Sequence, residues 1–288
     1  MTNPARTDAS SAMRLWPLFL SLLVGSCTTP TPPSPTAPAP EGSPSLKVAE
    51  AAPDTAEKAK PDNTPIRQPK LVRTRIGGIS IEAVTFDSRS HHLVVADQPG
   101  GPASRWADSR AAGQALGGIA AINGGFFNPD GSPLGKVVAS GKTAGAENRA
   151  SSLGSGYYVE SPGGGMKLVR RQNYSGGRQA LQAGPFLVEN SKAVSGLSQR
   201  NSSARSFLAT DGKSGWILAR TGPSSLEGLG SALAGAKIGE IRVQSALNLD
   251  GGRSSDLWVS GSVASGPLQN RPLWNKPVRN FLVLSRRD

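Results

Sequence analysis

The sequence is poor in cysteine, histidine and aromatic residues, and each shortage narrows the possible functions. A single cysteine in 288 residues excludes a disulfide framework and a cysteine-rich zinc site. The two histidines, His91 and His92, are adjacent and far in sequence from other polar clusters, which favours surface positions and argues against Ser-His-Asp catalysis. Aromatic residues make up 5% of the chain, against 35 glycines and 23 prolines. This composition favours a strand-rich and loop-rich domain over a helical bundle.

Acidic residues are also scarce, with 20 Asp and Glu against 32 Lys and Arg, which gives a formal net charge of +12. Such a balance is typical of proteins that meet nucleic acid, an anionic envelope surface or an acidic substrate. The basic residues are scattered, without a basic block or alternation with aromatic residues in the body of the chain. We therefore expect no nucleic-acid partner.

The N-terminal segment has the pattern of an export signal. Residues 13–27 combine a basic start, a short apolar run and small residues, and they are too few for a spanning helix. Residues 24–27 resemble the lipobox of bacterial lipoproteins, which implies cleavage before Cys27 and its lipidation, and hence a membrane anchor. Thr28, in place of an aspartate, favours the outer membrane. The alternative is an ordinary secreted protein with an incidental cysteine.

Composition divides the chain into three parts. Residues 1–27 are expected to form the lipoprotein-type signal peptide. Residues 28–65 are rich in Pro, Ala and Thr and have too little apolar surface to offset the entropy of folding, so we expect a disordered linker. Residues 66–288 then form one folded domain.

Within this domain, apolar runs and turn residues predict an α+β fold with mixed or antiparallel sheets and a few short helices. Strands 79–86 and 92–96 are expected to form a hairpin, as are strands 157–159 and 166–169. Helix 105–116 should begin at Ser104, and a second helix at the capping box Ser224–Glu227. Further strands are predicted at 119–122, 182–188, 205–209, 215–219 and 241–249.

Two parts of the chain repeat one order of elements: a helix, a glycine stop, an apolar strand and an Asn–Gly-rich turn. The first ends in Asn123-Gly124-Gly125, and the second in Asn248-Leu249-Asp250-Gly251-Gly252. We infer a degenerate internal two-fold repeat whose strand ends converge on one cleft. Asn123 and Asp250 should then lie within about two side-chain lengths of each other.

Asp250 is the most prominent candidate for chemistry. Paired glycines beside a carboxylate allow backbone N–H groups to approach an anionic ligand, although an Asp-Gly pair more often forms only a turn. Ser140–Thr143 lacks the first glycine of a phosphate-binding loop, so a turn after a strand is expected there. No ligand spacing predicts a metal site or cofactor, but a single divalent cation held by Asn248, Asp250 and backbone carbonyls is left open.

Four motifs together resemble the phosphodiester glycosidase family. They are Ala121–Phe127, Gln182–Pro185, Asn248–Gly252 with Ser254 and Ser255, and Pro277–Asn280, and the stretch from Ser203 to Arg205 is similar as well. The resemblance implies a hydrolase that cleaves the glycosidic bond of a sugar-1-phosphodiester in an envelope polysaccharide, wall polymer or glycolipid. Arg253 stands where the family more often has a third glycine.

The resemblance also implies roles for individual residues. Asp250 would be the nucleophile or general base, and Asn123 and Asn248 would orient sugar hydroxyls or hold that carboxylate. Arg205 and Arg253 would bind the phosphate, because guanidinium groups match phosphate oxygens. Hydrogen-bond donors would come from Gly124, Gly125, Gly251, Gly252, Ser254 and Ser255, and the Gln182 amide would contact substrate or close a turn. A non-catalytic polysaccharide-binding lipoprotein is the alternative.

Overall fold

The structure, a computed structural model, describes residues 65–288. The predicted signal peptide 1–27, Cys27 and all but the last residue of the predicted linker 28–65 lie outside this part. Contacts between Cα atoms divide the chain into residues 1–60 and 61–288, and the described residues belong to the second unit.

The described residues form three larger sheets in which every pair of neighbouring strands is antiparallel, as the predicted fold class allowed. The first sheet has the order β1 (Lys70–Ile76), β2 (Ile79–Asp87), β13 (Gly215–Thr221), β12 (Ser206–Thr210), β16 (Ser245–Asn248), β10 (Phe186–Glu189) and β11 (Lys192–Ala193). The second sheet has the order β18 (Leu268–Asn270), β17 (Leu257–Val259), β4 (Ala120–Asn123), β19 (Asn280–Arg286) and β3 (His91–Asp97). The third has the order β6 (Lys142–Ala144), β5 (Val137–Ala139), β9 (Gln179–Ala183), β7 (Gly156–Glu160) and β8 (Met166–Arg170), and β14 (Lys237–Ile238) pairs with β15 (Ile241–Arg242).

The main hydrophobic core lies between the three sheets. Alternate residues of the central strands face it, for example Val84 and Phe86 on β2, while Ile81 and Ala83 face a second core on the other side of the first sheet. The strands β13 and β19 show the same division. These strands are therefore buried on both faces, which explains their continuous apolar runs.

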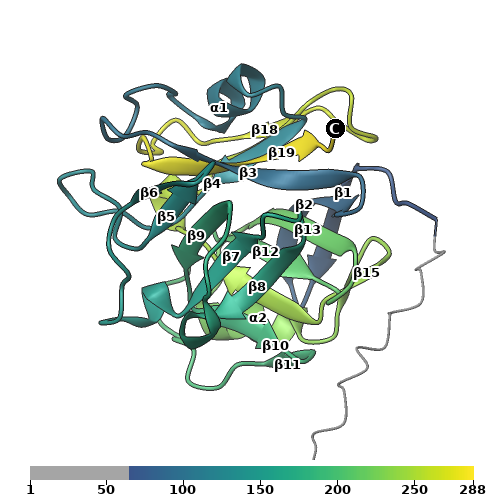
Figure 1. The fold of residues 1–288 in the computed structure, drawn as a ribbon. Helices are drawn as coiled ribbons and strands as arrows, with labels where there is room; N and C mark the ends of the chain where they lie inside the picture. Colours follow the sequence, from purple (N-terminus) through teal and green to yellow (C-terminus); the bar gives the residue numbers. More distant parts are fainter. Residues whose placement is uncertain (1–64) are drawn as a thin grey trace, which may run out of the picture. The chain divides into compact units, whose positions relative to one another are not determined.

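The two α-helices of the described part cover the outer faces of two sheets (Figure 1). Helix α1 (Ser109–Ala115) packs on β4, β17 and β19 of the second sheet, and α2 (Leu226–Leu233) packs on β10 of the first. Leu229 and Leu233 are fully buried, as their spacing predicted. No helix in residues 65–288 is long and apolar enough to span a membrane.

Both helices begin later than predicted. The Gln98 side chain accepts from the backbone N–H groups of Arg105 (2.8 Å) and Trp106 (2.7 Å), which holds these residues in a loop. Asp108, instead of Ser104, caps α1 by accepting from Ala111 N at 2.8 Å. Ser225, instead of Ser224, caps α2 by accepting from Gly228 N at 3.0 Å.

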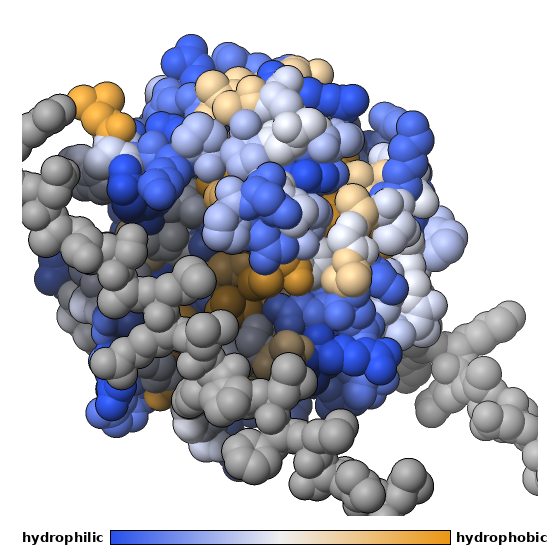
Figure 2. All heavy atoms as spheres, turned by 90° about the vertical axis from the view of Figure 1, so that its left-hand side faces the viewer, coloured by the Kyte–Doolittle hydropathy of each residue, from blue (hydrophilic) through white to orange (hydrophobic). Residues whose placement is uncertain are grey.

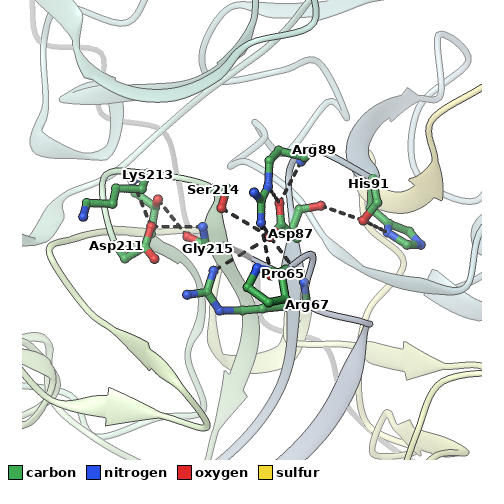
Figure 3. A network of polar contacts seen from close by, with 11 residues as sticks. Pro65, Arg67, Asp87, Arg89, His91, Asp211, Lys213, Ser214 and Gly215 are labelled. Atoms are coloured by element: carbon green, nitrogen blue, oxygen red, sulfur yellow. Dashed lines mark hydrogen bonds and ion pairs between the residues drawn. The ribbon is translucent and has the colours of Figure 1, made fainter. Parts of the chain in front are cut away.

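The predicted hairpin of strands 79–86 and 92–96 is wrong, because the two strands belong to different sheets. β2 pairs with β1 and β13, whereas β3 pairs with β19. The connection passes the buried carboxylate of Asp87, on which Arg67 and Arg89 converge in Figure 3. These ion pairs, with a hydrogen bond from the Ser214 hydroxyl (3.3 Å), stabilise the chain where it leaves one sheet for the other.

The expectation of two surface histidines is also wrong. His91 is buried, and its Nδ1 lies 2.9 Å from the Ser90 hydroxyl. His92 Nδ1 lies 2.9 Å from Oε1 of the buried Glu160, which Arg287 also contacts at 3.1 Å. The reason is tertiary: β3 is covered by the third sheet, so both faces of its first residues are shielded.

Other predicted connections are confirmed. Strands β7 and β8 form the expected hairpin, and residues 140–141 form a tight turn between β5 and β6 in place of a phosphate loop. The predicted strand 182–188 is divided, since β9 ends at Ala183 and the chain enters another sheet with β10 at Phe186.

Candidate active site around Asp250

The strand ends that carry Asn123 and Asp250 meet, although they come from different sheets. Asn123 is the last residue of β4, and Asp250 follows the end of β16 by two residues. Asn123 Nδ2 donates to the Asp250 carbonyl at 2.7 Å, and Asp250 N donates to the Gly124 carbonyl at 3.0 Å. The predicted convergence is therefore confirmed, while the internal repeat stays a prediction.

Asn123 is fully buried and uses both ends of its amide. Besides its bond to Asp250, its Oδ1 accepts from the Ser206 hydroxyl at 2.7 Å and from Asp256 N at 3.1 Å. The side chain thus ties β4, β12 and the loop after Asp250 together. The predicted roles were to orient sugar hydroxyls or to hold the Asp250 carboxylate, whereas the amide binds the backbone carbonyl of Asp250 and so holds the acidic loop.

Asp250 is half-buried at the start of that loop. Burial raises the pKa of its carboxyl group to about 6, and hydrogen bonds from the Ser254 side chain and the Gly251 N–H (2.8 Å) limit the rise. A carboxyl group with this pKa is ionised at neutral pH and is still a competent base. The environment therefore suits the role predicted for Asp250.

Arg205 lies beside the same loop, since a Cβ added at Gly251 would lie 3.6 Å from Arg205 Cδ. Its Nε donates to the Ser224 carbonyl at 3.0 Å and its Nη2 to the Asn201 carbonyl at 2.5 Å. Burial lowers its pKa, and it forms no ion pair with any carboxylate of residues 65–288. A guanidinium fixed by carbonyls and without an acid partner is suited to an anionic ligand.

Arg220, at the end of β13, was not found from the sequence. It is 8% exposed, and its Nε donates to the Ser255 carbonyl at 3.4 Å. Glu82 and Asp256 act on it only at longer range, and it too forms no ion pair in the described part of the chain. Desolvation lowers its pKa. The one sequence feature that could have drawn attention to Arg220 is its position directly after the apolar run of residues 216–219.

Arg220 also lines a cavity of about 400 Å³ whose other lining residues come mainly from β1 and β2. Arg73 and Arg75 line the same cavity, with Glu82 as its single acid, and the remaining lining includes Ser80, Thr221 and Asn270. Four residues pair in sequence across strands β1, β2, β13 and β12, namely Arg73, Glu82, Arg220 and Ser206. The Ser206 hydroxyl at the end of this row donates to Asn123. The cavity therefore has a net positive lining, and this polar row connects it to the residues that hold Asp250.

Several buried polar atoms near Asp250 have no partner among the described residues. Four of the nine such side-chain atoms belong to residues of this region, namely Asn248 Oδ1, Ser255 Oγ, Asn275 Oδ1 and Asn280 Nδ2. Buried polar groups are rarely left unpaired, and those that are tend to mark sites of water, ion or ligand binding. Their concentration here supports a binding site at these strand ends.

The glycines of the two motifs serve close packing in this structure. A Cβ at Gly124 would lie 2.1 Å from Asn280 Oδ1, and one at Gly251 would lie 3.0 Å from the Ala204 carbonyl. Their N–H groups, with those of Gly125 and Gly252, donate to Asn280, Asp250 and Ala204. Substrate binding through these four N–H groups stays a prediction.

The remaining predicted residues have different surroundings. Gln182 fastens the loop before β7, since its amide accepts from Lys136 N and Asn148 N and donates to the carbonyls of Asn148 and Gly154, which favours the predicted turn-closing role. Asn248 Nδ2 donates to the Gly184 carbonyl at 2.9 Å. Arg253 is exposed, and its Nε donates to the Trp274 carbonyl at 2.9 Å.

Asp256, the other carboxylate of this region, has a structural role. It accepts from the N–H (2.8 Å) and hydroxyl (2.7 Å) of Ser109 and pairs with Arg271 at 3.4 Å. The Asp250 carboxylate, in contrast, forms no ion pair with a basic side chain of residues 65–288. Residues 65–288 contain no group of three or more His, Cys, Asp or Glu side chains placed to hold a metal ion.

Comparison with known proteins assigns this arrangement to a family. The family model described as phosphodiester glycosidase matches residues 117–285, which include β4, the Asp250 loop and both arginines. The chain belongs to the phosphodiester glycosidase family. No curated protein matched the sequence.

Two solved structures show the same fold. The catalytic domain of zebrafish N-acetylglucosamine-1-phosphodiester alpha-N-acetylglucosaminidase, auto-inhibited by its pro-peptide, is 19% identical with a TM-score of 0.57, over 79% of this chain and 86% of that one. A hypothetical protein from Synechocystis is 18% identical with a TM-score of 0.51, over 78% of this chain and 64% of that one. At these identities the similarity shows that the chain shares the fold of these two proteins, and it does not show which substrate the chain acts on.

Proposed function

We propose that the protein hydrolyses the glycosidic bond of a sugar-1-phosphodiester. The observation that carries the proposal is Asp250, whose pKa is raised to about 6, on a loop that Arg220 contacts and that Arg205 adjoins. Neither arginine has an acid partner among residues 65–288. Membership of the phosphodiester glycosidase family supports the same reaction.

In the proposed reaction, the bond between the anomeric carbon and the phosphate oxygen breaks, and water supplies the hydroxyl of the free sugar. Asp250 acts as nucleophile or as the base that takes a proton from that water. Arg205 binds the phosphate with two N–H donors and Arg220 supplies a second cation. The phosphomonoester leaves as an anion, so a strong acid partner for Asp250 is not required.

We further propose that the substrate is an exported polysaccharide, a wall polymer or a glycolipid, and that the protein is an envelope lipoprotein anchored through Cys27. The support for this location is the signal pattern of residues 13–27. Labelling with radioactive palmitate in the native host tests it: label in the wild type and none in Cys27→Ser is the expected result.

Hydrolysis of a nitrophenyl glycosyl phosphodiester in water enriched in oxygen-18 tests the reaction. Cleavage of the sugar–oxygen bond places the label in the sugar, whereas cleavage of the phosphorus–oxygen bond places it in the phosphate. Asp250→Asn should abolish turnover, with Asp211→Asn, on the loop between β12 and β13, as the matched control. Label in the phosphate contradicts the proposal, and so does glycan binding by a wild type that turns over no such substrate.

A further inference from the structure

The turn formed by residues 272–276 presents the two most exposed large apolar side chains of the described residues. Leu273 is 100% exposed and Trp274 is 69% exposed, against 49% for Ile66 and 39% for Leu116. They are adjacent in sequence. In Figure 2, hydrophilic residues cover most of the visible surface and apolar residues gather mainly in a recess near its centre. Because Ile66 and Leu116 are the only other exposed large apolar residues within 65–288, the adjacent pair is an exception there and marks an interaction site.

The turn is held firmly, which distinguishes it from a loose loop. Asn275 N donates to the Pro272 carbonyl at 3.0 Å, so Leu273 and Trp274 occupy the two central positions of a tight turn. The buried Asn275 side chain donates to the Ser255 carbonyl at 2.6 Å. Lys276 N donates to the Arg253 carbonyl at 2.9 Å. The apolar pair is thus fixed on the loop that begins at Asp250.

Cations border the apolar pair. Arg253 and Lys276 are exposed, and neither forms an ion pair with a carboxylate of residues 65–288. Arg253 is placed by its bond from Nε to the Trp274 carbonyl at 2.9 Å. Residues 271–280 and 251–255 contain no acidic residue. The turn therefore combines an aromatic and an aliphatic side chain with two positive charges.

We propose that this turn docks on an anionic lipid bilayer. Tryptophan favours the interface between acyl chains and headgroups, and exposed Lys and Arg are attracted to anionic lipids. A protein partner is less consistent with the turn, because its two apolar side chains are far fewer than the residues that a stable protein interface buries. This contact is separate from the anchor predicted at Cys27, and it brings the Asp250 loop to the lipid surface.

Quenching by lipids with brominated acyl chains tests the contact in the full chain. The fluorescence of Trp274, measured as wild type minus Trp274→Phe, should be quenched by vesicles of brominated phosphatidylglycerol and phosphatidylethanolamine. The fluorescence of the buried Trp216, measured in the same way, should not. Each difference isolates the fluorescence of one tryptophan, so tryptophan in the N-terminal segment contributes to neither signal. An unquenched Trp274 overturns the proposal.

Matched variants test the chemistry of the contact. Leu273→Ser should raise the lipid concentration for half-maximal quenching of Trp274, whereas Leu116→Ser should not. Lys276→Gln should raise it about fivefold, in line with the attraction of one cation to an anionic surface, and Lys213→Gln should leave it unchanged. Equal quenching in phosphatidylcholine vesicles overturns the proposal. So does a Trp274 that is shielded from acrylamide without lipid, because another part of the chain or a second copy then covers the turn.

Discussion

The side-chain amide of Asn123 donates a 2.7 Å hydrogen bond to the backbone carbonyl of Asp250, so the end of a strand in one sheet positions the acidic loop that follows a strand of another. The same amide accepts from Ser206 and Asp256, and Asn123 is fully buried. Asn123 is accordingly a positioning residue that acts through Asp250.

Asn123→Asp should change the pH dependence of the reaction. An aspartate can accept the same two hydrogen bonds, but it loses the donor to Asp250 and adds a negative charge beside it, which raises the pKa of Asp250 further. We expect kcat/KM to fall by roughly a hundredfold, as for other losses of positioning, and its acid limb to move to higher pH. The exposed Asn190→Asp is the control. A fall in activity without a shift of the limb contradicts this mechanism.

Activity of the wild type should rise with pH through an apparent pKa of about 6. Burial raises the pKa of Asp250 to that value, and the nucleophile or base must be ionised. The measurement is kcat/KM for a glycosyl phosphodiester between pH 4 and 8. A profile that is flat across this range, or that falls as pH rises through 6, shows that Asp250 does not act in its ionised form.

Asp250→Asn should stabilise the protein at neutral pH. The folded pKa of about 6 lies above the ordinary value of 3.8, so the stability contributed by the protonated carboxyl is fully present below pH 3.8 and is lost as pH rises through 6. Asparagine does not ionise, and we expect a gain of about 2 kcal/mol at pH 8 and little change at pH 4. Urea unfolding at both pH values measures it, and equal effects at the two would contradict it.

The strands could be predicted from the sequence far better than their partners. Apolar runs indicate β12 and β13 directly, because both strands are buried on both faces. The same pattern does not tell which sheet a strand joins, so β2 and β3 were wrongly paired across Asp87. Helix α1 starts later than predicted because the Gln98 side chain accepts from the N–H groups of Arg105 and Trp106, which were expected to begin the helix. This contact is tertiary, so the local sequence does not reveal it.

In the candidate site, too, residues in local sequence motifs could be predicted, whereas a residue placed by tertiary structure could not. Asn123 and Asp250 stand in turn motifs next to glycines, and these motifs made them visible. Arg220 is one of 32 basic residues, and nothing in its sequence neighbourhood distinguishes it from an arginine with an acid partner. Its surroundings follow from strand pairing, which places Arg220 between Ser206 of β12 and Glu82 of β2.

Asp87→Asn should destabilise the protein above pH 4. Burial alone would raise the pKa of Asp87, but hydrogen bonds and charge from Arg89, with a hydrogen bond from Arg67, lower it to about 2. The stability from this carboxylate is thus present above the unfolded pKa and is lost as pH falls through 2. We expect a loss of about 2 kcal/mol at pH 7.

The control for Asp87 is Asp211→Asn, which keeps the oxygen that accepts from Lys213 N and Gly215 N and has no ion pair to lose. Chemical unfolding at pH 7 compares the two variants. If Asp87→Asn is no more destabilising than Asp211→Asn, the convergence of Arg67 and Arg89 in Figure 3 contributes nothing to stability.

Arg220→Gln should impair substrate binding without unfolding the protein. Arg220 is buried without an acid partner, so its removal leaves no carboxylate unpaired and relieves a desolvated charge. If it binds the phosphate, losing a charge-assisted hydrogen bond should raise KM by roughly tenfold to a hundredfold.

Arg279→Gln provides the contrast. Arg279 is equally buried but holds Asp97 with two bonds, at 2.8 and 3.0 Å, so its loss leaves a buried carboxylate unpaired and should destabilise the fold by about 3 kcal/mol. Urea unfolding and steady-state kinetics on the two variants separate the roles. Should Arg220→Gln unfold as readily as Arg279→Gln while KM stays at the wild-type value, Arg220 supports the fold and the cavity that it lines is not an anion site.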